Sequence, residues 1–511
     1  MNAQAVFAGL SVLAVVFCGV GIWSFRKKGF QSISDFFLGD RAVRPSLIVS
    51  LLVAGSFSLN GMLYQIYLGY KIGLWALVPQ AFWALSFFWL SRYTEKIRSS
   101  TGLHKLLGEV FSQNTRKLAA LCSIIGLGLQ IGWEFEVAKS AFSGLTIPPL
   151  PALSVEFAVA TVLAIATFYT LSGGLRSNSL SDLLENFLKG ACFVLLFLLV
   201  IGVSHIFSTP DWGRALLPPV NVAVTELTWV GVPTNILFSI AWQFVDIGTW
   251  QAVVATKSET GTDAAARSLR RAGYWVFVAP GIIGTAIGIA LVGNSLDANS
   301  VLPAVIKLVG DAPWMTFTLT LAISATAMSF IGTTLLAIAF TLITDLLYPA
   351  TVDREKLLLP PSAETRSDPE YQRAVISIVS WTRVALVVVA LVGTYVLEEI
   401  SYAFGLGLFD QVYIVIITQL ALFGPVMVAL KGRQPYRFSG ELSVLVALVF
   451  GIGFAVVGVI FHNADLTTGA SIIGLGLSLA IALLLSTKAI RVVAGPTPAT
   501  PLETQGEGQA K

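Results

Sequence analysis

Long apolar runs dominate the pattern of hydrophobic and polar positions. The hydrocarbon core of a bilayer needs about 20 apolar residues of helix, and about thirteen runs of that length follow one another along the chain. The first extends from Gln4 to Phe25. Only short polar segments separate the runs, so the pattern predicts an all-α polytopic membrane protein in contact with the lipid bilayer.

Basic residues gather after every second run. The first such cluster contains Arg26, Lys27 and Lys28. The positive-inside rule places these clusters in the cytoplasm. We therefore expect a multi-pass protein of an inner or plasma membrane, with its N-terminus outside and its C-terminus in the cytoplasm.

Composition narrows the function classes. Hydrophobic residues make up 55% of the chain and charged residues 12%, which excludes an ordinary soluble protein. The net charge of +3 is explained by the cytoplasmic loops and indicates no nucleic-acid partner. Cys18, Cys122 and Cys192 lie inside apolar runs without metal or disulfide spacing. We find no catalytic constellation, so the sequence predicts neither an enzyme nor a bound cofactor.

Two spans are interrupted by polar and small residues. The second span contains Gly55, Ser56, Ser58, Asn60 and Gly61, and the seventh contains Gln243, Asp246, Gly248 and Thr249. Interrupted helices at equivalent positions of two five-helix halves are typical of inverted-repeat transporters, whose sites lie at the bilayer midplane. The alternative is that these small residues merely allow close helix packing.

Several segments resemble the sodium:solute symporter family, in the order and at the spacing of that family. They are Ser34 to Arg41, Ala54 to Leu74, Tyr169 to Arg176, Asp246 to Arg267 and Met328 to Pro349. The resemblance implies a LeuT-type five-plus-five inverted repeat that works by alternating access. It divides the chain into an extra helix (1–30), a ten-helix core (31–435) and two further helices (436–493). The Pro-, Thr- and Gly-rich tail (494–511) is expected to be disordered in the cytoplasm.

The resemblance also implies an ion site. In the family, sodium binds between the broken helix and a later core helix, through carbonyls and two adjacent hydroxyls. Carried over to this chain, the carbonyls belong to Ala54, Phe57 and Thr326, and the hydroxyl pair falls on Ser329 and Phe330. Phe330 has no oxygen to offer a hard cation. The coupling ion therefore stays open between sodium and a proton.

Charges inside spans are costly and usually mark partners or wet cavities. Asp246 could bind an ammonium group or help gate the site; alternatively, it could satisfy unwound backbone amides. Glu134, expected in the outer third of its span, is a candidate for substrate or proton binding, whereas Glu136 is expected to pair with Lys139 one turn on.

A second group of charges falls on one helical face. Glu185 precedes Lys189 by four residues, which predicts an internal salt bridge. By resemblance, Asp182 on the same face lies on the inner ion exit route of the family.

The remaining candidate substrate contacts are uncharged. Ser56 stands where the proline symporters of the family have an aspartate, and Asn60 where the sugar symporters have a glutamate. Trp242, one turn before Asp246, could stack over a solute, and Gln243 neighbours it.

These observations predict a secondary-active symporter of a small polar organic solute. An amine-bearing solute such as an amino acid is slightly favoured because of Glu134 and Asp246. A sodium or proton gradient would drive it. The alternative is a nutrient-sensing membrane module that binds solute and signals through a separate cytoplasmic partner.

Overall fold

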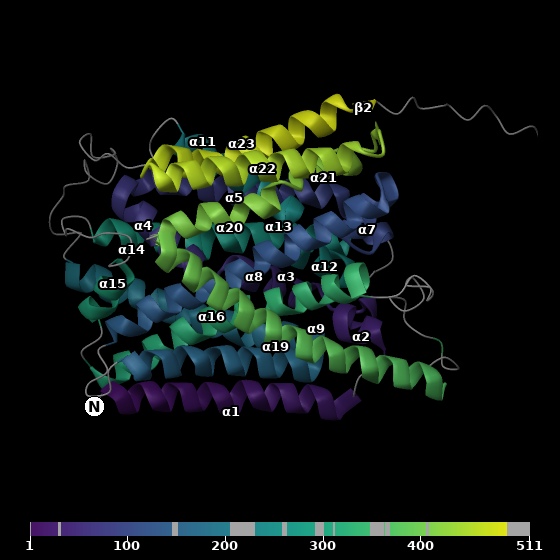
Figure 1. The fold of residues 1–511 in the computed structure, drawn as a ribbon. Coiled ribbons are helices and arrows are strands. Elements are labelled where there is room, and N and C mark those ends of the chain that lie inside the picture. The colour runs from purple at the N-terminus through teal and green to yellow at the C-terminus, as the bar shows by residue number, and fades with distance from the viewer. Residues whose placement is uncertain are drawn as a thin grey trace, which may run out of the picture.

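Helices account for nearly all of the described structure, because backbone groups in a hydrocarbon layer have no water to bond with and must bond within the chain. The computed structural model describes residues 2–28, 32–145, 152–204, 230–257, 263–291, 301–309, 312–347, 362, 368–404 and 408–487. Figure 1 shows that most long helices lie side by side in one bundle. The expected tail, 494–511, lies outside the described residues.

The elements follow in chain order. The long helices are α1 (Asn2–Lys28), α8 (Gln113–Gly144), α9 (Ala152–Ser204), α16 (Pro313–Thr341), α19 (Pro369–Phe404), α22 (Ser439–Ile460) and α23 (Ala464–Leu484). The shorter helices before α9 are α2 (Ile33–Leu38), α3 (Pro45–Ser56), α4 (Leu59–Ile72), α5 (Leu77–Leu90), α6 (Thr94–Ser100) and α7 (Leu103–Val110). Those after α9 are α11 (Gly231–Val245), α12 (Ile247–Ala255), α13 (Ala264–Val276), α14 (Gly284–Ala290), α15 (Val301–Val309), α20 (Leu408–Leu420) and α21 (Phe423–Leu430).

Short irregular elements join these helices. The 3-10 turns are η1 (Gly39–Arg41), η2 (Gly73–Ala76) and η3 (Ser91–Tyr93), and the π-helical turns are η5 (Phe277–Ile283) and η6 (Leu342–Leu347). Strands β1 (Gln434–Pro435) and β2 (Ser486–Thr487) pair antiparallel, with Gln434 opposite Thr487. This small ribbon ties the segment after α21 to the end of α23.

The chain is a multi-pass helical membrane protein. Nine helical stretches within the described residues are long and apolar enough to cross a membrane. The most apolar window of Pro313–Leu346 is 89% buried, against 33% for Gln4–Arg26, so α16 lies at the centre and α1 at the edge. Helices α22 and α23 pack together on the far side from α1 (Figure 1). The expected number of thirteen crossings stays a prediction.

Helix α9 is two spans joined by a reversal at Gly174. That residue has φ 55° and ψ −144°, outside helical values, and a Cβ there would lie 2.3 Å from the carbonyl oxygen of Phe36. Thr170 and Asn178, 8 residues apart in sequence, are joined by a hydrogen bond of 3.0 Å across the reversal; in a straight helix they would be about 12 Å apart. Residues 152–204 therefore form two spans that run in opposite directions.

Both predicted helix breaks are present. The second span is broken into α3 and α4 at Phe57 and Ser58, and the seventh into α11 and α12 at Asp246, whose backbone is extended (φ −73°, ψ 110°). Gly55, Ser56 and Ser58 surround the first break and Gly248 follows the second, and glycine and serine are poor helix formers.

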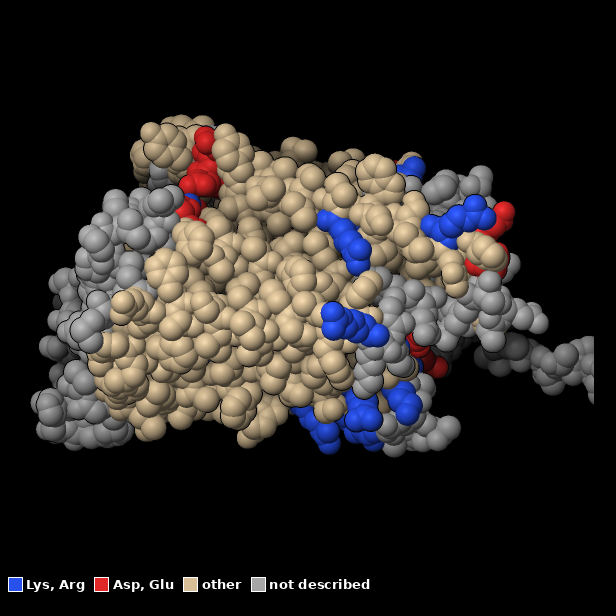
Figure 2. Space-filling model, turned by 90° about the horizontal axis from the view of Figure 1, so that it is seen from below, with Lys and Arg blue, Asp and Glu red and all other residues tan. Residues whose placement is uncertain are grey.

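Charge is distributed unevenly over the surface. Figure 2 shows lysine and arginine gathered toward the end of the bundle where α1 finishes, with a broad uncharged region beside it. We call this part of the bundle the basic end. It contains Arg26, near the C-terminus of α1, and helix α7. This grouping agrees with the alternation of basic clusters along the sequence; which side of a membrane it faces stays a prediction.

Candidate transport site

The break between α3 and α4 diverts three backbone N–H groups from their helical partners. In a continuous helix the amides of residues 59, 60 and 61 would bond four residues back, to residues 55, 56 and 57. Here the amide of Gly61 donates to the hydroxyl of Ser58 at 3.2 Å, the N-cap of α4. The hydroxyl of Ser58 donates in turn to the amide oxygen of Asn60 at 2.6 Å.

Glu134 of α8 holds the other two amides. Its carboxylate oxygens accept from the amide of Leu59 at 2.7 Å and from the amide of Asn60 at 3.0 Å. Its depth in the span stays a prediction, but the side chain is fully buried, 0% exposed, at the start of α4. The physical reason is that a negative charge at a helix N-terminus complements the helix dipole and satisfies amides that would otherwise lack partners.

Lys189 of α9 bonds the other side of the break. Its fully buried ammonium donates to the carbonyl oxygen of Phe57 at 3.0 Å and to the hydroxyl of Ser329 at 2.9 Å. The same ammonium lies 4.9 Å from the centre of the Phe57 ring. A positive charge therefore sits at the C-terminus of α3, where the helix dipole favours it.

The predicted ion-binding residues lie around this ammonium. Phe57 and Ser329 bond it directly, and the hydroxyl of Ser329 donates to the carbonyl oxygen of Thr326 at 3.0 Å. Ala54 is buried in the last turn of α3. Phe330 lines the solute cavity described below.

The expected salt bridge between Glu185 and Lys189 is not formed. Neither carboxylate oxygen of Glu185 has a hydrogen-bond partner within the described residues, and the ammonium of Lys189 bonds other groups. Lys189 extends to the helix break instead, because Phe57 and Ser329 offer its ammonium two acceptors there. Asp182 is also buried without such partners, and its carboxyl interacts with that of Glu185.

Asp246 caps the second break. Its carboxylate accepts from the amides of Gly248 at 3.2 Å and Thr249 at 2.9 Å, and the hydroxyl of Thr249 lies 2.5 Å away. Gln243 lies 2.9 Å from the same hydroxyl. Of the two expectations for Asp246, the structure shows the bonding of unwound amides.

A cavity lies between the two broken helices. Its walls come from the break, from α5 and α8, and from α11. They are formed by Gly55, Ser56, Ser58, Asn60, Gly61, Tyr64, Gln65, Pro79, Gln80, Trp83, Gln130, Trp133, Asn235, Phe238, Ser239, Trp242, Pro280, Phe330, Tyr413 and Ile416. Of the predicted substrate residues, Ser56, Asn60 and Trp242 line this cavity, whereas Glu134, Gln243 and Asp246 do not.

Aromatic rings form one wall of the cavity. Trp83 and Trp242 stack with ring centres 6.1 Å apart and an interplanar angle of 20°, and Phe238 meets both edge-on. The hydroxyl of Tyr64 bonds the side-chain oxygen of Asn235. Such walls give a solute flat apolar faces, with polar groups between them.

Four buried polar atoms of lining residues have no hydrogen-bond partner among the described residues. They are the amide nitrogen of Asn60, the indole nitrogens of Trp83 and Trp133, and the amide oxygen of Gln130. Buried polar atoms are normally bonded, so each such atom in a native protein requires an explanation. A polar solute bound in the cavity would provide the missing hydrogen-bond partners.

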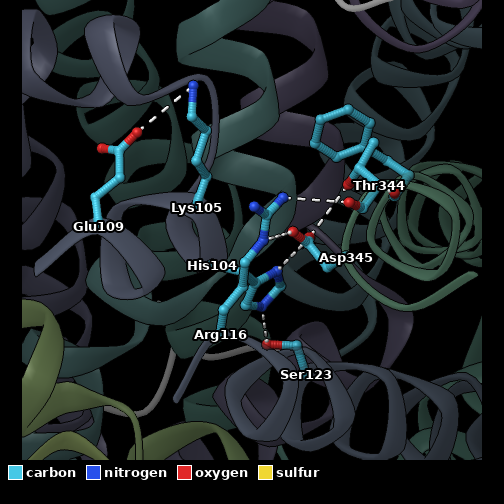
Figure 3. Close-up of polar contacts among 8 residues, drawn as sticks. His104, Lys105, Glu109, Arg116, Ser123, Thr344 and Asp345 are labelled. Atoms are coloured by element: carbon cyan, nitrogen blue, oxygen red, sulfur yellow. Dashed lines mark hydrogen bonds and ion pairs between the residues drawn. The ribbon is translucent and has the colours of Figure 1, made fainter. Parts of the chain in front are cut away.

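A second cluster of buried charge lies at the basic end. Figure 3 shows Arg116 and His104 converging on Asp345. The Nε of Arg116 lies 2.7 Å from one carboxylate oxygen of Asp345, and the Nδ1 of His104 lies 3.1 Å from the other. The Nε2 of His104 lies 2.9 Å from the hydroxyl of Ser123. We call these residues the basic-end cluster; it joins α7, α8 and η6.

The chain resembles solved transporters in structure. No protein-family model and no characterised protein sequence matches it. A Na+-coupled sialic acid symporter, in a substrate-bound outward-open state, matches with a TM-score of 0.71 at 16% identity, over 95% of this chain and 99% of that one. A nucleobase-cation-symport-1 family transporter, closed with bromovinylhydantoin bound, matches with a TM-score of 0.48 at 13% identity, over 88% and 94%.

The likeness to the sialic acid symporter establishes the fold. It covers nearly both chains, and the LeuT-type helical class predicted from the sequence is confirmed. The chain thus has the fold of a polytopic transporter. At such low identity, substrate, ion and family do not follow from the likeness.

Sequence reasoning found the breaks but missed Lys189 as a site residue. It interpreted that side chain as one half of a local ion pair. Two features of the sequence together could have indicated its role. Phe330 replaces a hydroxyl residue of the family's ion site, and a lysine lies inside another apolar span. The basic-end cluster was also missed, because His104 and Asp345 are 241 residues apart.

Proposed function

We propose that this protein is a secondary-active transporter that carries a small, uncharged polar solute through the central cavity by alternating access. The expected sodium:solute symporter membership belongs to this proposal. It is supported by the ordered motifs from Ser34 to Pro349 and by a fold that fits them. The orientation, with the C-terminus in the cytoplasm, is part of the same proposal.

The observation that carries the proposal is the set of unpartnered polar atoms in the cavity wall. Three are N–H donors, on Asn60, Trp83 and Trp133, and one is an acceptor, on Gln130. Donors outnumber acceptors, so a solute rich in hydroxyl, ether or carbonyl oxygens fits best. Sugars, polyols, nucleosides and cyclic amides have this character.

The residues that line the cavity also indicate the charge of the solute. None of the lining residues among the described parts of the chain is charged. Glu134 and Asp246, which favoured an amine-bearing solute at the sequence level, both bond backbone amides. The amides at the start of α4, where a solute carboxylate would dock, are already bonded by Glu134. A zwitterionic amino acid therefore meets no opposite charge, and the geometry favours an uncharged solute over it.

The test is uptake into proteoliposomes from a library of radiolabelled sugars, polyols, nucleosides, cyclic amides and amino acids, with sodium and proton gradients imposed separately. Concentrative uptake of an uncharged member is the expected result. Uptake of amino acids alone would contradict the solute class. Solute binding without uptake under any gradient would contradict transport and favour the sensing module, for which no comparison supports a signalling partner.

A variant pair tests the cavity. Trp83→Phe keeps an aromatic ring beside Trp242 but removes the unpartnered N–H, so the half-saturating solute concentration should rise about tenfold. Trp89→Phe, on the same helix but outside the cavity wall, is the matched control and should leave uptake unchanged. Equal effects of the two changes would remove Trp83 from the site.

A further inference from the structure

A chain of hydrogen bonds runs from the start of α4 into the cavity wall. The amide of Gly61 donates to the hydroxyl oxygen of Ser58 at 3.2 Å, and the hydroxyl of Ser58 donates to the side-chain oxygen of Asn60 at 2.6 Å. Ser58 and Asn60 are 5% and 3% exposed. The side-chain nitrogen of Asn60 has no partner among the described residues. The chain therefore ends on an N–H donor of a residue that lines the cavity.

The hydroxyl of Ser58 decides which end of the Asn60 amide is left for a solute. A serine hydroxyl has a single hydrogen, and the acceptor that it meets among the described residues is the Asn60 oxygen. If the amide turned over, its nitrogen would face the Ser58 oxygen, and the Ser58 hydrogen would lose its acceptor. A hydrogen bond left unmade at a buried site is costly. The orientation with the Asn60 oxygen toward Ser58 is therefore the stable one.

The backbone around the two side chains is fixed as well. Glu134 accepts from the backbone amide of Asn60 at 3.0 Å. Ser58 has the extended backbone of an N-cap, with φ −88° and ψ 164°. A Cβ at Gly61 would lie 3.0 Å from the hydroxyl oxygen of Ser58, so glycine at this position leaves space for the hydroxyl. These contacts hold Ser58 and Asn60 in one geometry.

The three unpartnered donors of the cavity wall differ in one respect. An indole N–H can only donate, so Trp83 and Trp133 offer a solute the same polarity in any orientation. A carboxamide can offer either its N–H groups or its oxygen. Asn60 is therefore the donor whose polarity depends on a neighbouring side chain, and that side chain is Ser58.

We propose that Ser58 is a positioning residue for solute recognition. It binds the oxygen of Asn60, leaves the Asn60 N–H groups for the solute, and so requires a solute that places a hydroxyl, ether or carbonyl oxygen beside the helix break. This inference rests on the proposed function, because the solute is the one carried through the same cavity. It adds the group that the solute presents at one position and the residue that enforces this choice.

The hydrogen bond itself is tested without a solute. Melting temperatures of the purified full chain are compared for Ser58→Ala, Asn60→Ala and the double variant. If the two side chains are bonded, each single change removes the same bond, so the shift of the double variant should be smaller than the sum of the two single shifts. Shifts that add would show that Ser58 does not hold Asn60, and would overturn the proposal for any solute.

The requirement for an oxygen is tested by competition for uptake into proteoliposomes. The probe is the sugar, polyol or nucleoside of the library that the wild type accumulates best, competed by its monodeoxy and deoxyfluoro analogues. For a cyclic amide the thioamide replaces both, because sulfur is a weak acceptor. At the oxygen that Asn60 binds, the deoxy analogue or the thioamide should compete about tenfold less well than the parent.

The fluoro analogue distinguishes an oxygen that accepts from one that donates. Fluorine can accept a hydrogen bond weakly but cannot donate one, so the deoxyfluoro analogue should compete better than the deoxy analogue at this position. A deoxyfluoro analogue that competes no better would mean that the solute donates to Asn60. That result would contradict the polarity that Ser58 is proposed to set.

Two variants assign the effect to named residues. The oxygen in question is the one whose deoxy or thioamide penalty disappears in Asn60→Ala, and the absence of such a position would remove Asn60 from the site. Ser58→Ala allows the amide to turn, so the penalty at that oxygen should fall from about tenfold to about threefold, with the maximal uptake rate little changed. Ser58→Thr keeps the hydroxyl and should restore the penalty. If Ser58→Ala does not fold, Ser58→Cys, whose thiol is a weak donor, carries the test.

Ser32 provides the matched control. It is the N-cap of α2, where it accepts from the amide of Asp35 at 2.8 Å and donates to the carboxylate of Asp40 at 3.0 Å. It is not among the residues that line the cavity. Ser32→Ala should lower the melting temperature, as the loss of a cap does, and leave every penalty unchanged.

The two failures can be told apart. If Ser58→Ala also lowers the melting temperature and leaves every penalty unchanged, Ser58 only caps α4, and the proposal fails while transport stands. A wild type that takes up no member of the library would instead overturn the proposed function, and with it the selection of a solute. The melting temperatures would still establish or exclude the bond between Ser58 and Asn60.

Discussion

The helix break and the basic-end cluster both bury charge, but in opposite ways. At the basic end, Arg116 and His104 contact the carboxylate of Asp345 directly, at 2.7 and 3.1 Å. At the break, Glu134 and Lys189 stand on opposite sides and bond only amides, a carbonyl and a hydroxyl. A direct ion pair holds two helices together. The separated charges at the break instead stabilise the two ends of an interrupted helix, and a bound ligand could stabilise those ends in the same way.

The two regions therefore have different roles. The basic-end cluster joins α7, α8 and η6 and would have to separate if the bundle opened at that end. At the break, Glu134 and Lys189 bond separate backbone groups and do not pair with each other. Variants in the two regions should therefore differ in kind as well as in size, and the following changes sharpen or break that contrast.

The largest loss is expected from Glu134→Ala. It strips the amides of Leu59 and Asn60 of their acceptor and removes one of the acidic groups that act on Lys189, at a cost of about 4 kcal/mol. The melting temperature of the purified protein measures it. Glu136→Gln is the control on the same helix, because Lys139 keeps Glu156 at 3.2 Å and Glu398 at 2.9 Å as partners. Equal destabilisation by the two would mean that Glu134 does not hold the break.

A somewhat smaller loss is expected from Asp345→Asn. The change keeps the shape of the side chain but leaves Arg116 without its ion pair at a site where Asp345 is 5% exposed, at a cost of about 3 kcal/mol. Because the cluster ties three elements at one end, the same variant should also become more accessible to thiol labelling at a cysteine placed at Ser123. Unchanged labelling together with an unchanged melting temperature would show that Asp345 does not hold α7, α8 and η6 together.

A modest loss is expected from Ser329→Ala. Lys189 keeps the Phe57 carbonyl but loses one of its two acceptors, which costs about 1 kcal/mol. If the ammonium replaces sodium, neither Ser329→Ala nor Phe330→Ser should change the response of the melting temperature to sodium. A sodium response that Phe330→Ser strengthens and Ser329→Ala abolishes would restore the ion site implied by the family resemblance.

The sequence predicted the architecture because it depends on local patterns. Apolar runs of bilayer length and the small polar stretches at Gly55 to Gly61 and at Asp246 are all readable in short windows, and the helices and both breaks follow from them. The expected pair of Glu136 and Lys139 is likewise local, and the structure confirms it at 3.3 Å.

The site was less predictable because its contacts are long-range. Lys189 reaches residues 132 and 140 positions away in sequence, so its local acid at Glu185 was the natural partner to expect. Glu134 lies 75 positions from the amide that it accepts. Which of several partners a buried charge selects depends on how the helices pack, and helical periodicity shows only which residues share a face.

The smallest effect is expected at the exposed edge of the basic end. Lys105 and Glu109 form an i,i+4 pair at 3.5 Å, with side chains 16% and 51% exposed (Figure 3). The lysine precedes the glutamate, which is the less favourable order for the helix dipole, and solvent screens the pair. Glu109→Gln should therefore cost no more than about 0.5 kcal/mol, and less at high salt. A loss as large as that of Asp345→Asn would mean that charge near the basic end, rather than the direct buried pair, stabilises this region.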